Sequence, residues 1–130
     1  EEVAAATRRG PGAARRSMME IPMAGHTIVH EAVGVHDSSR VLIKPAAPGT
    51  GVIAGGAVPQ ILEAARVKDA LPKSMGAATH LNVARATMNA LLAQRRPDEV
   101  ARLRGKRAEE IVPPGLLAAY RSAEAMKARA

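Results

Sequence analysis

Residues 44–58 read Lys44-Pro45-Ala46-Ala47-Pro48-Gly49-Thr50-Gly51-Val52-Ile53-Ala54-Gly55-Gly56-Ala57-Val58, and the rest of the chain is arranged around them. Glycine permits positive φ and close approach of another backbone, whereas proline fixes its own φ and holds the preceding residue extended. A loop with four glycines and two prolines costs stability, so we expect it to hold or brace something. The candidates are the phosphate of a nucleotide, the phosphate of an RNA backbone, and another element of the fold.

Strands are predicted on the N-terminal side of this loop. The alternation of residues 19–23 predicts a short strand, and the β-branched residues of 27–35 predict a second one. Asp and Ser side chains within residues 36–39 are typical of a hairpin turn. A third strand is predicted over 40–44, and its apolar centre favours burial on both faces.

Helices and one more strand are predicted after the loop. An apolar stripe from Val58 predicts a helix of about ten residues, with Pro59 in its first turn. Residues 67–75 predict a fourth strand, which Pro72 either restricts to an edge of the sheet or interrupts. Thr79 is expected to cap the next helix. The predicted buried stripe of that helix is Leu81, Ala84, Met88, Leu91 and Leu92.

The two ends of the chain are predicted to be helical. Residues 1–17 begin like a helix that Gly10-Pro11-Gly12 should break. Pro97 is well placed to start a short helix, and the linker 113–115 precedes an amphipathic helix over 116–130. The predicted order is β-β-β-α-β-α with a helical tail. This order favours a two-layer α+β fold, in which two helices cover one face of a sheet.

Charge and aromatic content narrow the classes of partner. The 130-residue chain has a formal net charge of +7 and a pI of about 10.8, which favours nucleic acid first and an acidic membrane second. Tyr120 is the only aromatic residue, so bases cannot be held by a stacking platform. Contacts to phosphate, sugar and groove shape remain. No run of 18 apolar residues exists, which excludes a spanning helix.

Residue types needed for catalysis are present but not in catalytic patterns. His26 and His30 are expected on one strand face without a carboxylate or Cys cluster, so we expect no metal and no cofactor. Residues 36–39 include the types of a catalytic triad, but adjacent turn residues cannot adopt its geometry. The glycine loop lacks the Gly-Lys-Ser/Thr of a Walker loop and the spacing of the dinucleotide fingerprint. We therefore assign no catalytic residue.

The glycine stretch resembles the signature of bacterial small-subunit ribosomal protein five. The resemblance covers about residues 15–111 in family order. Further matching segments are Gly34-Val35-His36-Asp37-Ser38-Ser39-Arg40-Val41, Val67-Lys68-Asp69-Ala70-Leu71-Pro72-Lys73-Ser74-Met75-Gly76, Asn82-Val83-Ala84-Arg85-Ala86-Thr87, Arg104-Gly105-Lys106 and Glu109-Glu110. The chain departs from the family where the glycine motif is followed by Pro59-Gln60 in place of an Arg, and where Arg66 replaces a helix-ending glycine.

The resemblance implies a fold, a role and partners. The implied fold is a two-layer β3-α-β-α unit with a left-handed crossover, an exception to the right-handed rule. The implied role is that of a non-enzymatic component of the small ribosomal subunit, associated with decoding accuracy and messenger entry. The implied partners are small-subunit ribosomal RNA, which the chain would bind, and small-subunit proteins four and eight, which it would contact. The ribosome would be cytoplasmic, or alternatively organellar. Almost all of the family's N-terminal domain lies outside this sequence.

These inferences divide the chain into a remnant helix or basic arm at 1–17, a ribosomal domain at 18–96 and a helical extension at 97–130. Two roles remain possible for the glycine loop: direct contact with phosphate, or close packing within the fold. The residues expected to contact RNA are Arg15, Arg16, Arg40, Lys44, Gly49, Thr50, Gly51, Lys68, Lys73 and Arg85. Two alternatives stay open: a small-metabolite kinase-like fragment that binds phosphate, and a module that docks proteins through 116–130.

Overall fold

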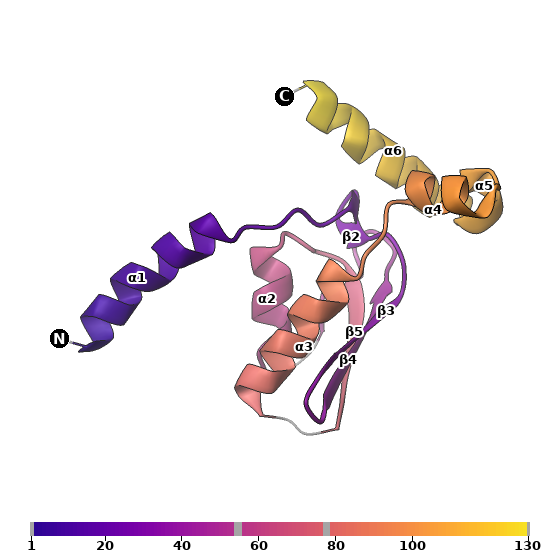
Figure 1. The fold of residues 1–130 in the computed structure, drawn as a ribbon. Coiled ribbons are helices and arrows are strands. Elements are labelled where there is room, and N and C mark those ends of the chain that lie inside the picture. Colours follow the sequence, from indigo (N-terminus) through magenta and orange to yellow (C-terminus); the bar gives the residue numbers. More distant parts are fainter. Residues whose placement is uncertain (1, 54–55, 77–78, 130) are drawn as a thin grey trace.

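The computed structural model describes residues 2–53, 56–76 and 79–129, apart from the side chains of residues 2 and 6–8. Ala54 and Gly55 of the glycine loop lie outside the described residues. Three strands form an antiparallel sheet in the order β3 (Ala32–His36), β4 (Ser39–Pro45) and β5 (Ala70–Gly76). Helices α2 (Val58–Ala64) and α3 (His80–Leu92) lie together on one face of this sheet (Figure 1). The fold class is therefore α+β, as predicted.

The hairpin between β3 and β4 confirms the predicted turn. His36 pairs with Ser39, which leaves Asp37 and Ser38 as a two-residue loop, and Asp37 has a φ of 50°. Positive φ in such a loop matches the twist of the flanking strands, and Asp tolerates it better than most residues. This turn fixes the register of the sheet and so decides which side chains reach each face.

Strand β4 is not buried on both faces, and that prediction was wrong. Val41 and Ile43 are fully buried, while Arg40 and Lys44 on the other face are exposed. Because both helices lie on the same face, the alternating side chains of a central strand meet a core on one side only. Strand β5 confirms the prediction for Pro72, since β5 is an edge strand in the described sheet.

The predicted strands before β3 are shorter than expected. Strand β1 (Met23–Ala24) pairs with β2 (Thr27–Ile28), and residues 19–22 are not in a strand. Gly25 has a φ of 67° in the turn between them. The chain turns again before β3, where the side chain of Gln94 forms hydrogen bonds with both the amide and the carbonyl of His30. The turn at Gly25 separates β1 from β2, and the second turn divides the single strand predicted over 27–35 into β2 and β3.

Helix α3 packs on the sheet through a face that matches the prediction only in part, since Leu91 is buried as predicted. Leu81 is 59% exposed, and Met88 and Leu92 are also exposed. The cause is the close approach of α3 to Gly34, where an added Cβ would lie 1.8 Å from the carbonyl oxygen of Ala86. Only small side chains fit at such a contact, so the helix turns its small residues to the sheet. The buried residues of α3 are Val83, Ala86, Thr87, Ala90 and Leu91.

The caps of these helices are only partly as predicted. Thr79 occupies the N-cap position of α3, but its side chain makes no capping hydrogen bond. At the end of α2, Arg66 has a φ of 63°, the left-handed conformation that glycine adopts most easily. The amide of Val67 donates to the carbonyl of Leu62 at 2.8 Å and that of Arg66 donates to Glu63 at 2.9 Å. Arg66 thus holds a backbone position suited to glycine.

The C-terminal helices form a second core with the β1–β2 hairpin. They are α4 (Pro97–Arg104), α5 (Ala108–Ile111) and α6 (Pro114–Arg129), and Pro97 begins α4 as predicted. The linker prediction was wrong for Pro114 and Gly115, because proline is well suited to the first turn of α6. The buried residues of this core are Ala24, Val29, Ala101, Ala108, Leu117 and Tyr120. The apolar face of α6 is therefore used within the chain.

Helix α1 (Glu2–Arg16) is continuous, although Gly10-Pro11-Gly12 was predicted to break it. The fixed φ of proline is close to the helical value, but Pro11 removes a backbone hydrogen bond and its ring crowds the preceding turn, so the continuous helix costs stability there. After Ser17 the chain leaves α1 in an extended segment, and the helix projects away from the sheet (Figure 1). None of the described helices has the length and apolarity needed to cross a bilayer.

Candidate nucleic-acid interface

The side of the sheet away from α2 and α3 carries three of the cations that are expected to contact RNA. Cross-strand pairing places Val35, Arg40 and Met75 in one row, and Val33, Leu42 and Lys73 in the next. Lys44 lies opposite Leu71 in a third row. We call these eight residues the open face. It consists of Val33, Val35, Arg40, Leu42, Lys44, Leu71, Lys73 and Met75.

The open face is cationic and has no acid of its own. Arg40, Lys44 and Lys73 are exposed, and none forms an ion pair with another described residue. The apolar side chains among them are also accessible, with Val33 50% exposed and Leu71 52% exposed. Guanidinium and ammonium groups spread over such a surface attract phosphates, and apolar groups between them can contact ribose. The surface lacks a ring on which a base could stack.

The described part of the glycine loop is held by a carboxylate of the protein itself. Oδ1 of Asp69 accepts hydrogen bonds from the amides of Gly49 at 3.1 Å and Gly51 at 2.9 Å. Asp69 is only 7% exposed. Both glycines have positive φ, and a Cβ at either would meet no atom within 4 Å, so the backbone conformation is what requires glycine there. The carboxylate occupies the place where a phosphate oxygen would bind in a phosphate loop.

The third amide of this segment is also engaged. The amide of Thr50 donates to the carbonyl of Ala47 at 3.1 Å, and its hydroxyl donates to the same oxygen at 2.7 Å. The three amides of residues 49–51 therefore all have partners within the fold. Of the three roles considered for this stretch, contact with another element of the fold is the one the described geometry favours.

The remaining cations named from the sequence lie elsewhere. Arg85 is exposed on α3, which covers the opposite face of the sheet. Arg15 and Arg16 lie in the last turn of α1. Lys68 is exposed beside the β1–β2 hairpin, where its backbone amide donates to the carbonyl of His26 at 2.9 Å. The structure thus brings three of the seven cations together and separates the other four from them.

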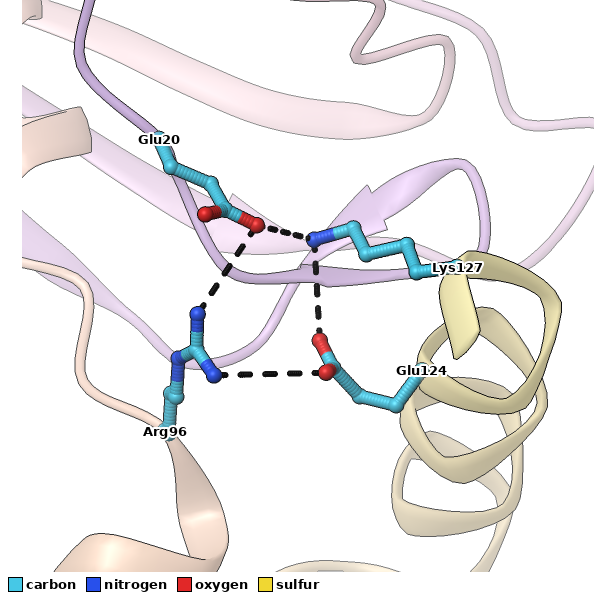
Figure 2. A network of polar contacts seen from close by, with 4 residues as sticks. All are labelled: Glu20, Arg96, Glu124 and Lys127. Atoms are coloured by element: carbon cyan, nitrogen blue, oxygen red, sulfur yellow. Dashed lines mark hydrogen bonds and ion pairs between the residues drawn. The ribbon is translucent and has the colours of Figure 1, made fainter. Parts of the chain in front are cut away.

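Four further charged residues form a network that joins distant parts of the chain (Figure 2). Nζ of Lys127 lies 2.7 Å from Oε1 of Glu20 and 3.6 Å from Oε1 of Glu124. Arg96 contacts the same two acids, at 3.7 Å and 4.0 Å. The hydrogen bond from Lys127 and the charges of Lys127 and Arg96 lower the pKa of Glu20, and the bond to Glu20 raises the pKa of Lys127. The two cations are therefore already balanced by acids.

A second set of contacts that sequence reasoning missed joins His30 to the start of the tail. Gln94 is 6% exposed; its Oε1 accepts from the amide of His30 and its Nε2 donates to the carbonyl of His30, both at 3.1 Å. The amide of Arg95 donates to Nε2 of His30 at 2.9 Å. No local signal could have found these bonds, because the partners are 64 and 65 residues apart in sequence.

The histidines do not share a strand face, so that prediction was wrong. His26 lies in the turn between β1 and β2, and His30 follows β2. The tight turn at Gly25 places His26 outside the strands, and a separate bend after β2 does the same for His30. Among the residues that the structure describes, no group of three or more His, Cys, Asp or Glu side chains is arranged to hold a metal ion.

Comparison with known proteins identifies relatives of this chain. Residues 31–104 match the family described as ribosomal protein S5, C-terminal domain. Over 130 aligned positions the chain is 47% identical to the small ribosomal subunit protein uS5 of Bifidobacterium adolescentis. The alignment covers 98% of this chain and 54% of that protein. The chain thus spans about half the length of the curated relative it matches.

Proposed function

Because the chain belongs to the family of the ribosomal protein S5 C-terminal domain, we propose that it is a structural, non-enzymatic component of the small ribosomal subunit and binds its RNA. One observation carries the proposal for RNA: Arg40, Lys44 and Lys73 share an open face that has no acid to neutralise them. The net charge of +7 supports the same kind of partner.

The mechanism we propose is neutralisation of phosphates together with a fit of shape. Cations that replace condensed counterions on a nucleic acid gain affinity from the release of those ions. Neighbouring rows of the open face lie two residues apart along β4, so they are separated by about 7 Å, and the cations of the three rows can meet different phosphates. Val33 and Leu42 between the cations would meet ribose rather than base edges. Binding of this kind carries little sequence information.

Other contacts in the proposal are peripheral to the open face. Arg15, Arg16, Lys68 and Arg85 would reach RNA from other surfaces of the chain, and each is at least partly exposed. In the glycine loop, Gly49 and Thr50 are exposed and Gly51 is half-buried, so contact there would involve their outer surface and not their amides. These residues should contribute less to affinity than the three cations that act together.

The resemblance also supports finer parts of the proposal. We infer the division into 1–17, 18–96 and 97–130, with the first segment being a remnant of the N-terminal domain's helix or a basic arm. The parallel bridge between Val52 and Ala70, with α2 between them, is where a left-handed crossover would lie. The protein partners would be small-subunit proteins four and eight, in a cytoplasmic ribosome.

A salt titration tests the proposal. The variant Arg40→Gln/Lys44→Gln/Lys73→Gln should bind a small-subunit RNA fragment more weakly, with a slope of log K against log salt reduced by about 0.7–0.9 for each phosphate that is no longer neutralised. The matched control is Arg102→Gln/Lys106→Gln/Arg129→Gln, which removes the same charge from exposed sites that form no ion pair with another described residue. Equal weakening in the two variants would mean that the open face has no special part in binding.

No described observation favours the kinase-like alternative. A nucleotide would need free amides in the glycine loop, and those of residues 49–51 are engaged. The alternative of docking through 116–130 loses its apolar anchor, since Leu117 and Tyr120 are buried against the hairpin.

A further inference from the structure

A groove separates the sheet domain from the helical tail. It has a volume of about 420 Å³, within the range of about 300–1,000 Å³ typical of ligand sites. Val29 and Pro45 form its wall on the side of the sheet, and Val100, Ile111 and Leu116 form its wall on the side of the tail. Ile111 and Leu116 lie outside the segment that matches the family, so the groove is only partly built from family-matched residues.

The two walls are held in place without a ligand. The bonds from Gln94 and Arg95 to His30 connect the start of the tail directly to the connection before β3. Gln94 is buried, and such bonds are costly to break once their groups are removed from water. A groove fixed in this way needs little rearrangement when it binds, which favours affinity.

Charged groups stand at the rim of the apolar groove. Arg95 and Arg104 line it and are exposed, and Glu31 is the one acid among the described residues of its lining. None of the three forms an ion pair with a described residue. The rim therefore has an excess of one positive charge with two guanidinium groups available. A guanidinium binds a carboxylate with two parallel hydrogen bonds.

We propose that this groove binds a peptide segment of another protein in which apolar side chains flank a carboxylate. The apolar side chains would enter between Val29 and Leu116, and the carboxylate would meet Arg95 and Arg104. Burial of apolar side chains in a pocket is the usual anchor of a protein interface. A nucleic-acid backbone fits less well, because its phosphates could meet Arg95 and Arg104 at the rim but would lose water if the chain entered between the apolar walls.

Amide NMR of the full 130-residue chain with three capped tripeptides tests the proposal. Leucine-aspartate-leucine should cause saturable shifts at Val100, Ile111 and Leu116. Leucine-asparagine-leucine, which lacks only the charge, and glycine-aspartate-glycine, which lacks only the apolar groups, should each bind at least about fivefold more weakly. Arg104→Gln should weaken the first peptide by about fivefold, whereas Arg102→Gln, on the same helix but outside the groove, should leave it unchanged.

Three results would overturn this assignment. Equal binding of the aspartate and asparagine peptides would show that the carboxylate has no role. The absence of saturable shifts at the groove with every peptide would show that it takes no such segment. A single-stranded ribo-oligonucleotide that shifts the same residues more strongly than the peptides would assign the groove to RNA. None of these results depends on the open face, which the glutamine variants of Arg40, Lys44 and Lys73 test separately.

Discussion

The ammonium group of Lys127 lies 2.7 Å from the carboxylate of Glu20, although 107 residues separate the two in sequence. The bond joins the segment that follows α1 to the last turns of α6. With Arg96 and Glu124 it forms a network that holds the tail close to the β1–β2 hairpin (Figure 2). The tail is thus fixed both by a small apolar core and by charge.

The network makes docking of the tail dependent on pH and salt. The lowered pKa of Glu20 gives stability that is complete above the ordinary value of 4.5 and is lost as pH falls through the lowered value. The raised pKa of Lys127 gives stability that is complete below 10.5 and is lost as pH rises through the raised value. Glu20→Gln should reduce the loss of docking stability that occurs as the pH falls. Fluorescence of Tyr120, the only aromatic residue, reports the docking.

The control for this prediction is the same comparison of wild type with Glu20→Gln at high salt. At 1 M salt the Debye length is about 3 Å, so wild type and Glu20→Gln should behave alike there. A difference between them that persists unchanged at high salt would mean that the tail is held by packing alone.

Removal of the Asp69 charge should loosen the glycine loop. Asp69→Ala leaves the amides of Gly49 and Gly51 without their buried acceptor and should lower the free energy of unfolding by about 2–4 kcal/mol. Asp69→Asn, which keeps one oxygen, should cost less. Glu63→Gln, at an exposed and unpaired acid in α2, should change stability by less than about 0.5 kcal/mol. Urea denaturation measures all three, and an Asp69→Ala variant as stable as Glu63→Gln would show that the loop is held by other contacts.

An added methyl group at Gly34 should separate α3 from the sheet. Its Cβ would lie 1.8 Å from the carbonyl oxygen of Ala86 and 2.5 Å from the amide nitrogen of Ala90, and neither backbone atom can move alone. Gly34→Ala should therefore cost about 3 kcal/mol or more in chemical denaturation. Gly115→Ala, where nothing lies within 4 Å of the new Cβ, is the control and should cost nothing. If the two variants were equally stable, α3 would have to lie farther from Gly34 than the structure has it.

Arg66 offers a stabilising substitution. Its φ of 63° is left-handed, and this conformation costs a residue with a Cβ about 1 kcal/mol relative to glycine. Arg66→Gly should raise the free energy of unfolding by roughly 0.5–1 kcal/mol. Arg66→Ala removes the same charge but keeps the Cβ, so it should give no gain. If both variants gained equally, the cause would be charge and not backbone conformation.

Features decided within a few residues could be predicted from the sequence, and contacts between distant residues could not. The hairpin at Asp37, the edge position of Pro72 and the start of α4 at Pro97 each follow from local backbone chemistry. The buried face of α3 depends on Gly34, which lies far earlier in the sequence, so the largest apolar residues were a poor guide to it. The partner of the glycine loop, Asp69, is likewise set by tertiary packing.

The candidate interface shows the same limit. The cations of the open face could be named from the sequence, but their grouping depends on the register across three strands. Arg85 looks equivalent to them in sequence, yet it lies on a helix that covers the opposite face. Arg96 and Lys127 could not be set apart as neutralised cations, because their acids come from distant segments.

Acetylation of lysine side chains, read by mass spectrometry with and without small-subunit RNA, tests the central claim most directly. Lys44 and Lys73 lie on the open face, and Lys106 is an exposed lysine on the tail. RNA should slow acetylation of Lys44 and Lys73 by about tenfold or more, since a phosphate-bound ammonium is shielded, while Lys106 should react as before. Equal rates at Lys44 and Lys73 with and without RNA would contradict the central claim.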